Sequence, residues 1–88
     1  MPKNRKTNIE MYVINKIKEI RIEKGLSQEG IASALDTTRG FVGQIESPNY
    51  SAKYNLNHLN ILAKELKCSP KDFLPEKPIS ESQKPKAK

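Results

Sequence analysis

The stretch of sequence that decides the fold is LSQEGIASALDTTRGFVGQIE, residues 26–46. Ser27 is a favourable N-cap, because its hydroxyl oxygen can accept a hydrogen bond from an amide that the first helical turn leaves unpaired. Apolar residues then recur on one face at helical spacing, which predicts a short helix over 28–35. The residues expected on that face are Ile31, Ala32 and Leu35.

A turn and a second short helix follow in the sequence. Residues 36–38 are Asp, Thr and Thr, which favour turns and helix caps over helix interiors. Val42 and Ile45 resume the helical spacing, so we expect a helix over 39–46 with one of the two threonines as its N-cap. The stretch therefore predicts two short helices joined by three residues.

A longer helix is expected before this pair. Thr7 and Glu10 have the spacing of a capping box, which predicts a helix start at residue 8. Gly25 suits the left-handed position after a helix end, so this helix should end near residue 24. Its expected apolar stripe comprises Ile9, Val13, Ile17 and Ile20.

A further helix is expected after the pair. Residues 47–55 follow neither a helical nor an alternating period and predict a loop. Asn55 then caps an expected helix over 56–67. Its inner stripe is expected to comprise Leu56, Leu59, Leu62, Ala63 and Leu66.

The last ordered element should be a single helical turn. Ser69-Pro70 combines an N-cap with proline at the first helical position, and the turn should place Phe73 and Leu74 against the core. No segment of the chain alternates apolar and polar residues as a half-buried strand does. We therefore expect an all-α fold, a compact bundle of four to five helices.

Charge is distributed unevenly along the chain. The 88 residues have a formal net charge of +6. Three basic residues lie in 1–7, and four basic and two acidic residues lie in 76–88. The middle, 8–75, has nine basic and eight acidic residues. We expect a flexible basic N-terminal arm over 1–7, a folded domain over 8–75 and a disordered basic tail over 76–88.

Composition also excludes several classes of protein. One cysteine, Cys68, and one histidine, His58, cannot form a disulfide or the usual four-ligand zinc site, so we expect no metal and no cofactor. His58 is accompanied by no recognisable nucleophile or paired acids, so we do not expect an enzyme. No apolar run approaches the roughly 18 residues of a membrane span, and no apolar signal region follows the basic N-terminus. We expect a cytoplasmic protein with no membrane partner.

The two short helices and their surroundings resemble a known family. Roughly residues 14–74 resemble the phage repressor and Cro-like, or lambda repressor-like, helix-turn-helix family of bacterial and phage regulators. The resemblance is carried by IKEIRIEKGLSQ, residues 17–28, and by Ile31, Ala32, Leu35, Thr38, Val42, Ile45 and Glu46. It implies a five-helix domain whose third helix lies in the major groove of DNA while the second braces against the backbone.

The resemblance also implies roles for individual residues. It implies that Gln28 touches a phosphate and that residues 38–44 face the groove. It implies in addition that Arg21 pairs with Glu46. The same pair is expected from the residues alone, since each lies one helical turn after an apolar residue and projects toward an apolar face. We therefore assign Arg21 and Glu46 to a structural ion pair and not to DNA contact.

Gln44 is the best candidate for contacting a base. At about 100° per residue, Val42 and Ile45 centre the buried side of this helix, and Gly40 and Gln44 lie opposite. The Gln44 amide can bond an adenine edge in two places, and Gly40 would let the backbone approach closely. An ordinary solvated glutamine is the alternative.

Other DNA-binding candidates rest on position or residue type. Arg39 lies in the first turn, where a positive charge opposes the helix dipole but suits a phosphate or guanine edge; a solvated arginine is the alternative. Whichever of Thr37 and Thr38 is not the N-cap is free to donate to phosphate. Phe41 either packs toward the following loop, which we favour, or meets a thymine methyl. The remaining phosphate candidates rest on residue type alone: they are Asn49, Tyr50, Lys53 and Tyr54.

Several residues depart from the pattern of the family. Asp36 stands where the family usually has a glycine in the left-handed turn. Gly40 and Gly43 lie inside the recognition helix and offer no side chain to contact bases. Ser47-Pro48 replaces the glycine turn usual after this helix. These departures predict modest sequence selectivity.

The function predicted from the sequence is sequence-specific binding of double-stranded DNA by a transcriptional regulator, with residues 38–46 in the major groove. The alternative is a protein-interaction module or antitoxin on the same scaffold, with little or no sequence-specific DNA binding. No zipper or extra helix is available for pairing, so we expect a weak or DNA-assisted homodimer, with a protein partner as a further option.

Overall fold

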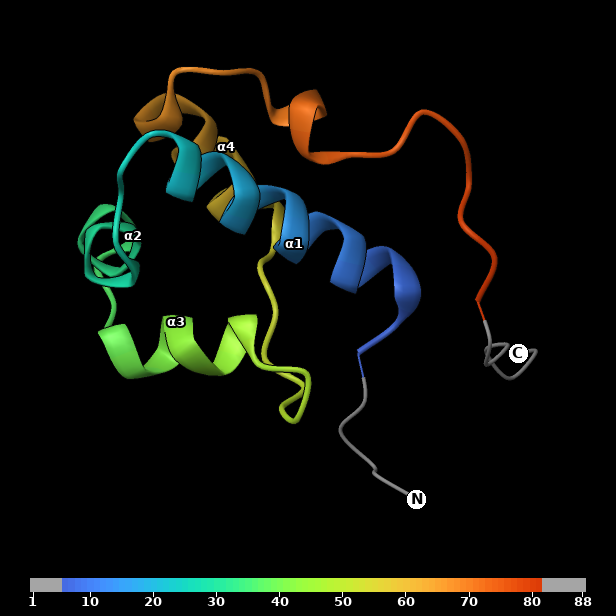
Figure 1. Ribbon diagram of the computed structural model, residues 1–88, viewed down its shortest axis with the longest axis horizontal. Helices are drawn as coiled ribbons and strands as arrows, with labels where there is room; N and C mark the ends of the chain where they lie inside the picture. The colour runs from blue at the N-terminus through green and yellow to red at the C-terminus, as the bar shows by residue number, and fades with distance from the viewer. Residues whose placement is uncertain (1–5, 82–88) are drawn as a thin grey trace.

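The computed structural model describes residues 6–81, which form four α-helices and one short 3-10 helix (Figure 1). The elements are α1 (Asn8–Glu23), α2 (Gln28–Leu35), α3 (Arg39–Glu46), α4 (Leu56–Leu66) and η1 (Pro70–Phe73). No residue within 6–81 belongs to a β-strand, and no helix there has the length and apolar character needed to cross a membrane. The expected all-α bundle of four to five helices is confirmed.

Every helix begins at a residue whose side chain accepts a hydrogen bond from an amide of the first turn. These N-caps are Thr7, Ser27, Thr38, Asn55 and Ser69. In three of the helices the third residue also accepts from the N-cap amide, which completes a capping box. The starts of the helices therefore follow from local side-chain chemistry, which is why they could be predicted from the sequence.

Three of the four α-helices end in the same way. Gly25, Asp36 and Lys67 follow α1, α2 and α4 with φ of 74°, 59° and 58°, in the left-handed region. In each case the next amide donates back to a carbonyl five residues earlier, over 2.7 to 2.9 Å. This Schellman ending satisfies carbonyls that the helix leaves unpaired and reverses the chain within a few residues. At Asp36 it produces the tight turn between α2 and α3.

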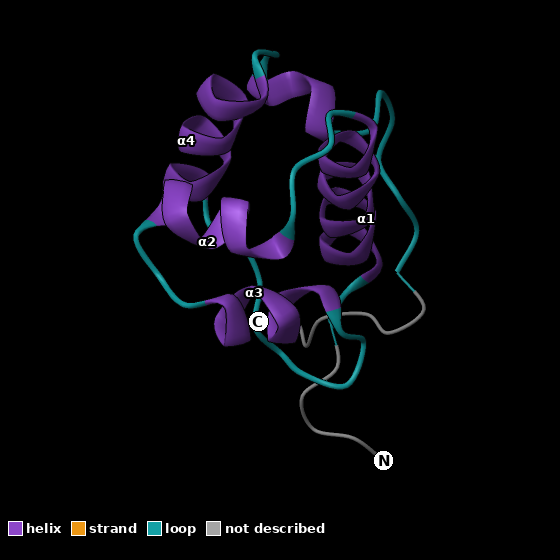
Figure 2. Cartoon of the chain, turned by 60° about the vertical axis from the view of Figure 1, so that its left-hand side comes forward, coloured by secondary structure: helices purple, strands orange, loops and turns teal. Residues whose placement is uncertain are grey.

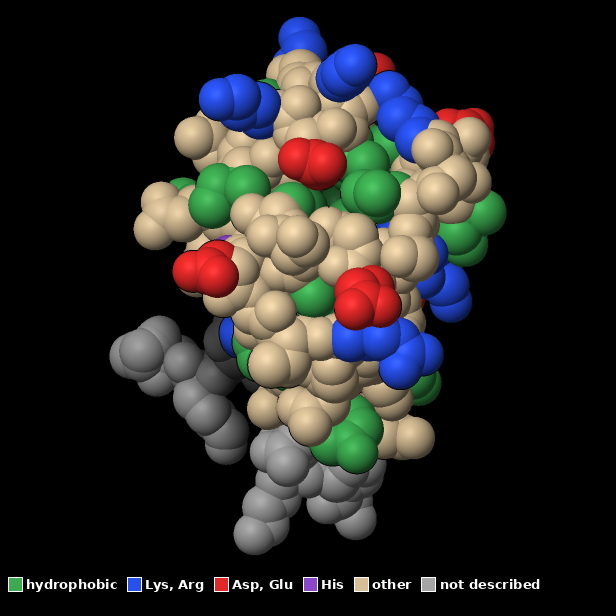
Figure 3. Space-filling view, turned by 90° about the vertical axis from the view of Figure 1, so that its left-hand side faces the viewer, with side chains coloured by type: hydrophobic (Ala, Val, Ile, Leu, Met, Phe, Trp, Pro, Cys, Tyr) green, Lys and Arg blue, Asp and Glu red, His purple; other side chains and the backbone are tan. Residues whose placement is uncertain are grey.

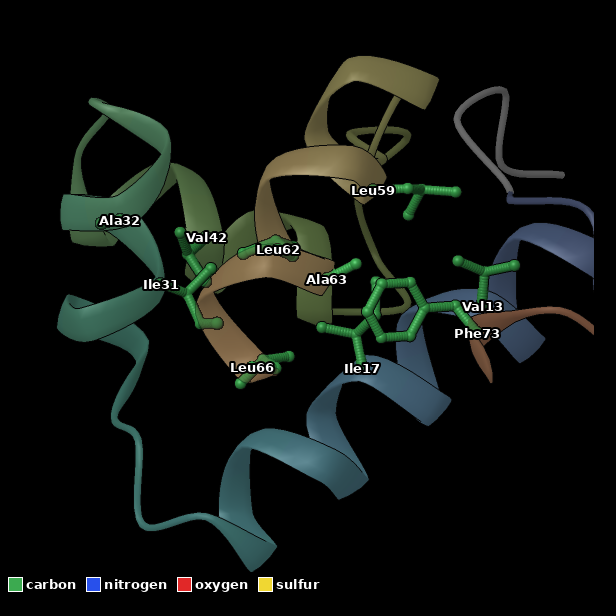
Figure 4. Packing of buried hydrophobic residues seen from close by; sticks show 10 residues of the cluster. All are labelled: Val13, Ile17, Ile31, Ala32, Val42, Leu59, Leu62, Ala63, Leu66 and Phe73. Atoms are coloured by element: carbon green, nitrogen blue, oxygen red, sulfur yellow. The ribbon is translucent and has the colours of Figure 1, made fainter. Parts of the chain in front are cut away.

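The core lies where the helices converge. Figure 2 shows α1 and α4 on opposite sides, α2 between them and α3 across one end. Buried apolar side chains from all five elements form one cluster, and Figure 4 shows Ile31 and Val42 on one side of it and Ile17 and Phe73 on the other. These four side chains are each 0% exposed. The bundle is therefore held mainly by apolar burial, with α3 fixed to it along one side.

Three apolar residues differ from their expected positions. Leu56 was expected on the inner stripe of α4 but is 81% exposed, because it is the first residue of the helix and the core begins one turn later. Leu74 was expected in the core but is 45% exposed, because it follows η1 in an extended conformation that turns it outward. Ile14 was absent from the expected stripe of α1 and is 1% exposed, since the buried face of α1 is wider than one stripe.

Both ends of the described chain contact helix termini. Lys6 is 5% exposed and its ammonium lies against the carboxyl end of α3. At the other end, the Glu81 carboxylate accepts hydrogen bonds from the amides of Asn8 and Ile9, the first residues of α1, over 2.6 and 3.1 Å. The remaining parts of the expected arm and tail, 1–5 and 82–88, lie outside the described residues.

Substituting Gly25 by alanine should isolate the cost of its left-handed backbone. An added Cβ would meet no heavy atom within 4 Å, so steric contacts contribute nothing. We expect Gly25→Ala to lower the free energy of unfolding by about 1 kcal/mol, measured by urea denaturation. The matched control is Gly40→Ala inside α3, where the nearest atom is 4.0 Å away and alanine should stabilise the helix by about 1 kcal/mol. Effects of the same sign at both positions would contradict this account.

Candidate nucleic-acid interface

α3 lies at the edge of the bundle with one side turned outward (Figure 2). Its inner side is fixed by Val42 and Ile45, which are both 0% exposed. On the outer side Gly40 and Gln44 are exposed, as expected from their angular positions. Neither the described part of the N-terminal arm nor the loop after α3 covers these two residues. The structure thus presents a small and a polar residue on a convex, helical surface.

The start of α3 is organised by two threonines with different roles. Thr38 is the N-cap, and its hydroxyl oxygen accepts from the Phe41 amide at 3.1 Å. Thr37 is half-buried and its hydroxyl takes no part in the cap. Arg39 is exposed at the first helical position, whereas Phe41 is half-buried. The Thr37 hydroxyl, which the cap does not use, and the Arg39 guanidinium therefore flank the amino end of α3.

Glu46 is held by three side-chain hydrogen bonds at the other end of α3. The Arg21 guanidinium, from α1, donates through Nε to Oε2 at 2.8 Å and through Nη2 to Oε1 at 2.9 Å. Gln28, from α2, donates through Nε2 to Oε1 at 2.9 Å. The Arg21 and Glu46 side chains are only 11% and 4% exposed. A bidentate, nearly buried pair of this kind fixes orientation as well as distance.

The environment of Glu46 favours its ionised form. Burial by itself raises the pKa of this carboxyl, but the hydrogen bonds from Arg21 and Gln28 and the charge of Arg21 outweigh burial and hold the pKa below its ordinary value. The same contacts raise the pKa of Arg21, principally through its hydrogen bond to Glu46. Both partners are therefore charged at neutral pH, and each depends on the other for compensation.

The Gln28 side chain bonds to Glu46 and is also partly exposed at the surface. One amide hydrogen is used by Glu46, which leaves the second hydrogen of the half-buried side chain. Gly43 of α3 lies beneath this side chain, since a Cβ built there would be 3.8 Å from Gln28 Oε1. A Cβ at Gly43 would therefore make an ordinary van der Waals contact with the Gln28 side chain.

Lys53 is not brought together with the α3 residues by any hydrogen bond or ion pair of residues 6–81. Its ammonium pairs with Glu10 of α1 at 2.7 Å. Burial raises the pKa of Glu10, but hydrogen bonds from Lys53 and from the N-cap Thr7 lower it further than burial raises it. Lys53 therefore connects the loop after α3 to the start of α1.

Tyr54 was a phosphate candidate by residue type alone, and Lys6 was not singled out as a site residue. The Tyr54 hydroxyl is buried without a hydrogen-bond partner among the described residues, and burial raises its pKa far above the usual range. Its phenol lies close enough to Glu46 and Arg21 to sense both charges. Lys6 lies against the end of α3. No local pattern indicates the burial of the Tyr54 hydroxyl or the carbonyl partners of Lys6, because both depend on contacts between distant parts of the chain.

Charge on the face formed by α2 is mixed. Figure 3 shows several Lys and Arg side chains along the upper edge of this face, and Asp and Glu side chains across its middle. Glu29, Asp36 and Arg39 lie together around the turn between α2 and α3. Because acidic side chains interrupt the basic ones on this face, it would attract phosphate only moderately.

Comparison with known proteins gives one finding. A family model described as helix-turn-helix matches residues 17–73, from the middle of α1 to the end of η1. No curated protein sequence matches the chain. The matched range contains α2, the turn and α3 in full, together with the Arg21, Gln28 and Glu46 network.

Replacing Glu46 by glutamine should remove a pH-dependent part of the stability. Glu46→Gln keeps the shape but leaves Arg21 facing a neutral amide, and we expect a loss of about 3 kcal/mol near pH 7. Because the pKa of Glu46 is lowered from 4.5 on folding, its charge stabilises the unaltered protein above that value. That stabilisation disappears as the pH falls through the folded-state pKa.

Urea denaturation of both proteins at a series of pH values measures the effect. The free energies of unfolding should differ most near neutrality and converge in acid, where Glu46 itself is neutral. A difference that is constant with pH would show that the charge of Glu46 contributes nothing.

Proposed function

Because the chain belongs to the helix-turn-helix family of DNA-binding regulators, we propose that it binds double-stranded DNA sequence-specifically as a transcriptional regulator, with α3 in the major groove. This family is regulatory and not enzymatic. The observation that supports the proposal best is the outward side of α3, where Gln44 and Gly40 are exposed while Val42 and Ile45 anchor the helix beneath. A helix presented in this way has the dimensions that the major groove accepts.

The roles proposed for the exposed residues follow from their chemistry. Gln44 donates to and accepts from an adenine edge, and Gly40 allows the α3 backbone to come close to the bases. At the amino end of α3, Arg39 and Thr37 bind phosphate, because Thr38 is already used as the N-cap. Phe41 is half-buried, so its main role is packing within the protein and not contact with DNA.

Phosphate contacts made by residues outside α3 would fix the position of the domain on the duplex. Gln28 binds a phosphate through the amide hydrogen that Glu46 leaves free. Lys53 can bind a flanking phosphate only after its ion pair with Glu10 breaks. Two copies on a two-fold site would have half-sites about 34 Å apart, and we propose that pairing is assisted by the DNA.

Salt dependence tests whether duplex binding occurs and which residues contribute. We expect the logarithm of the affinity to fall linearly with the logarithm of the salt concentration, by about 0.9 per phosphate neutralised. Arg39→Met should reduce this slope by about 0.9, because one phosphate contact is lost. Lys64→Met, which removes the same charge from α4, is the matched control and should leave the slope unchanged.

Fluorescence anisotropy titrations of a random-sequence duplex at several salt concentrations measure these slopes. Failure to bind any duplex at low salt would overturn the proposal and favour a protein-interaction module or antitoxin on the same scaffold.

Substituting Gln44 tests the proposed base contact. Gln44→Ala should relax the preference at one base pair by about 1 to 3 kcal/mol while leaving the thermal unfolding midpoint nearly unchanged. Sites selected from a random duplex pool by the unaltered and substituted proteins give the comparison. Asn57→Ala, an exposed change on α4, serves as the control. An unchanged site preference would exclude Gln44 from base recognition.

A further inference from the structure

The carboxyl end of α3 differs from the ends of the other α-helices. α1, α2 and α4 each end at a left-handed residue whose neighbouring amides bond back to the helix. α3 ends at Ser47, which is extended and donates only to Gln44, and Pro48 follows with no amide hydrogen. The backbone carbonyls at this end of α3 therefore need a partner from elsewhere in the fold.

Lys6 supplies that partner. Its ammonium is within hydrogen-bond distance of three carbonyl oxygens, those of Gln44, Ser47 and Tyr50. An ammonium has three N–H donors and no acceptor, so the number of donors matches the number of carbonyls. Its positive charge also interacts favourably with the partial negative charge at the carboxyl end of a helix. The residue is 5% exposed, so this interaction is shielded from water.

The interaction connects the start of α1 to the end of α3. Lys6 directly precedes the N-cap Thr7, and Figure 1 shows the segment before α1 beside the loop that follows α3. Arg21, near the other end of α1, holds the Glu46 side chain. The carboxyl end of α3 is thus fixed by two cations, one on its backbone and one on a side chain.

α3 depends on such external contacts more than the other helices do. It has eight residues, and two of them are the glycines Gly40 and Gly43, each of which weakens a helix by about 1 kcal/mol relative to alanine. If the carbonyls at its end lost their partner, the last turn of α3 and the loop would be free to shift. Gln44, whose own carbonyl is among the three, would then shift with them.

We propose that Lys6 is a positioning residue for DNA binding: it caps α3 and holds the helix and the following loop in the orientation that recognition requires, without touching DNA itself. This inference rests on the proposed function. Burial lowers the pKa of Lys6, while the nearby charge of Glu10 raises it, as expected for an ammonium facing protein and not solvent.

The test compares two lysines that both bond a carbonyl at a helix end. Lys6→Met removes the charge and the donors but keeps an unbranched side chain that matches lysine up to Cε. Lys24→Met removes the same charge from the end of α4, where Lys24 donates to the Leu66 carbonyl. We expect Lys6→Met to weaken duplex binding about tenfold, as the loss of buried hydrogen bonds would. Lys24→Met should change affinity by no more than about twofold, and Lys6→Arg should restore most of the loss because guanidinium also donates to carbonyls.

The salt slope separates positioning from direct contact. With Lys6→Met the slope should stay that of the unaltered protein, because no phosphate contact is lost; a fall of about 0.9 would overturn the proposal in favour of direct contact. Equal effects of Lys6→Met and Lys24→Met would overturn it too. Absence of duplex binding by the unaltered protein would instead overturn the proposed function, and this inference with it.

If Lys6→Met does not fold, an NMR measurement on the unaltered protein still tests the proposal. The ¹H–¹⁵N correlation of the Lys6 ammonium should be visible, protected from exchange with water, both before and after duplex is added. A signal that appears only with DNA, or that moves strongly when DNA binds, would show that Lys6 pairs with phosphate and would overturn the proposal.

Discussion

The position of α3 depends on one carboxylate, that of Glu46. Arg21 of α1 and Gln28 of α2 both donate to it, so a single group joins three helices. A nearly buried charge is tolerated only when it is paired and hydrogen-bonded, so these partners cannot be exchanged freely. Apolar burial of Val42 and Ile45 sets the depth of α3 in the bundle, and the Glu46 network sets its rotation.

Much of the fold could be predicted from the sequence because the signals are local. Thr7, Ser27 and Asn55 begin helices through hydrogen bonds to residues within the next turn, and Gly25 ends one through its own backbone. The turn at Asp36 was expected even though aspartate replaces the usual glycine. The sequence also predicted a pair between Arg21 and Glu46, and these side chains lie 2.8 Å apart.

The remaining features could not be predicted because they depend on where distant segments meet. Helical periodicity placed Leu56 inside, but it is the first residue of α4, and the point at which this helix enters the core depends on the elements packed against it. Residue type suggested phosphate for Lys53, whereas its contact with Glu10 depends on the path of the same loop. Lys6 was counted only as part of a basic arm, since nothing near it in sequence indicates carbonyl partners some forty residues away.

The bond between Glu81 and the first amides of α1 has a consequence for the connectivity of the chain. It brings residue 81 next to residue 8, so the two ends of the described fold leave the molecule side by side. A short peptide linker can therefore join position 81 to position 6 and close the backbone into a ring. Opening that ring after exposed Ser51, beyond the Tyr50 carbonyl that Lys6 binds, gives a circular permutant that retains every helix and the contacts of Lys6 and Arg21 with α3.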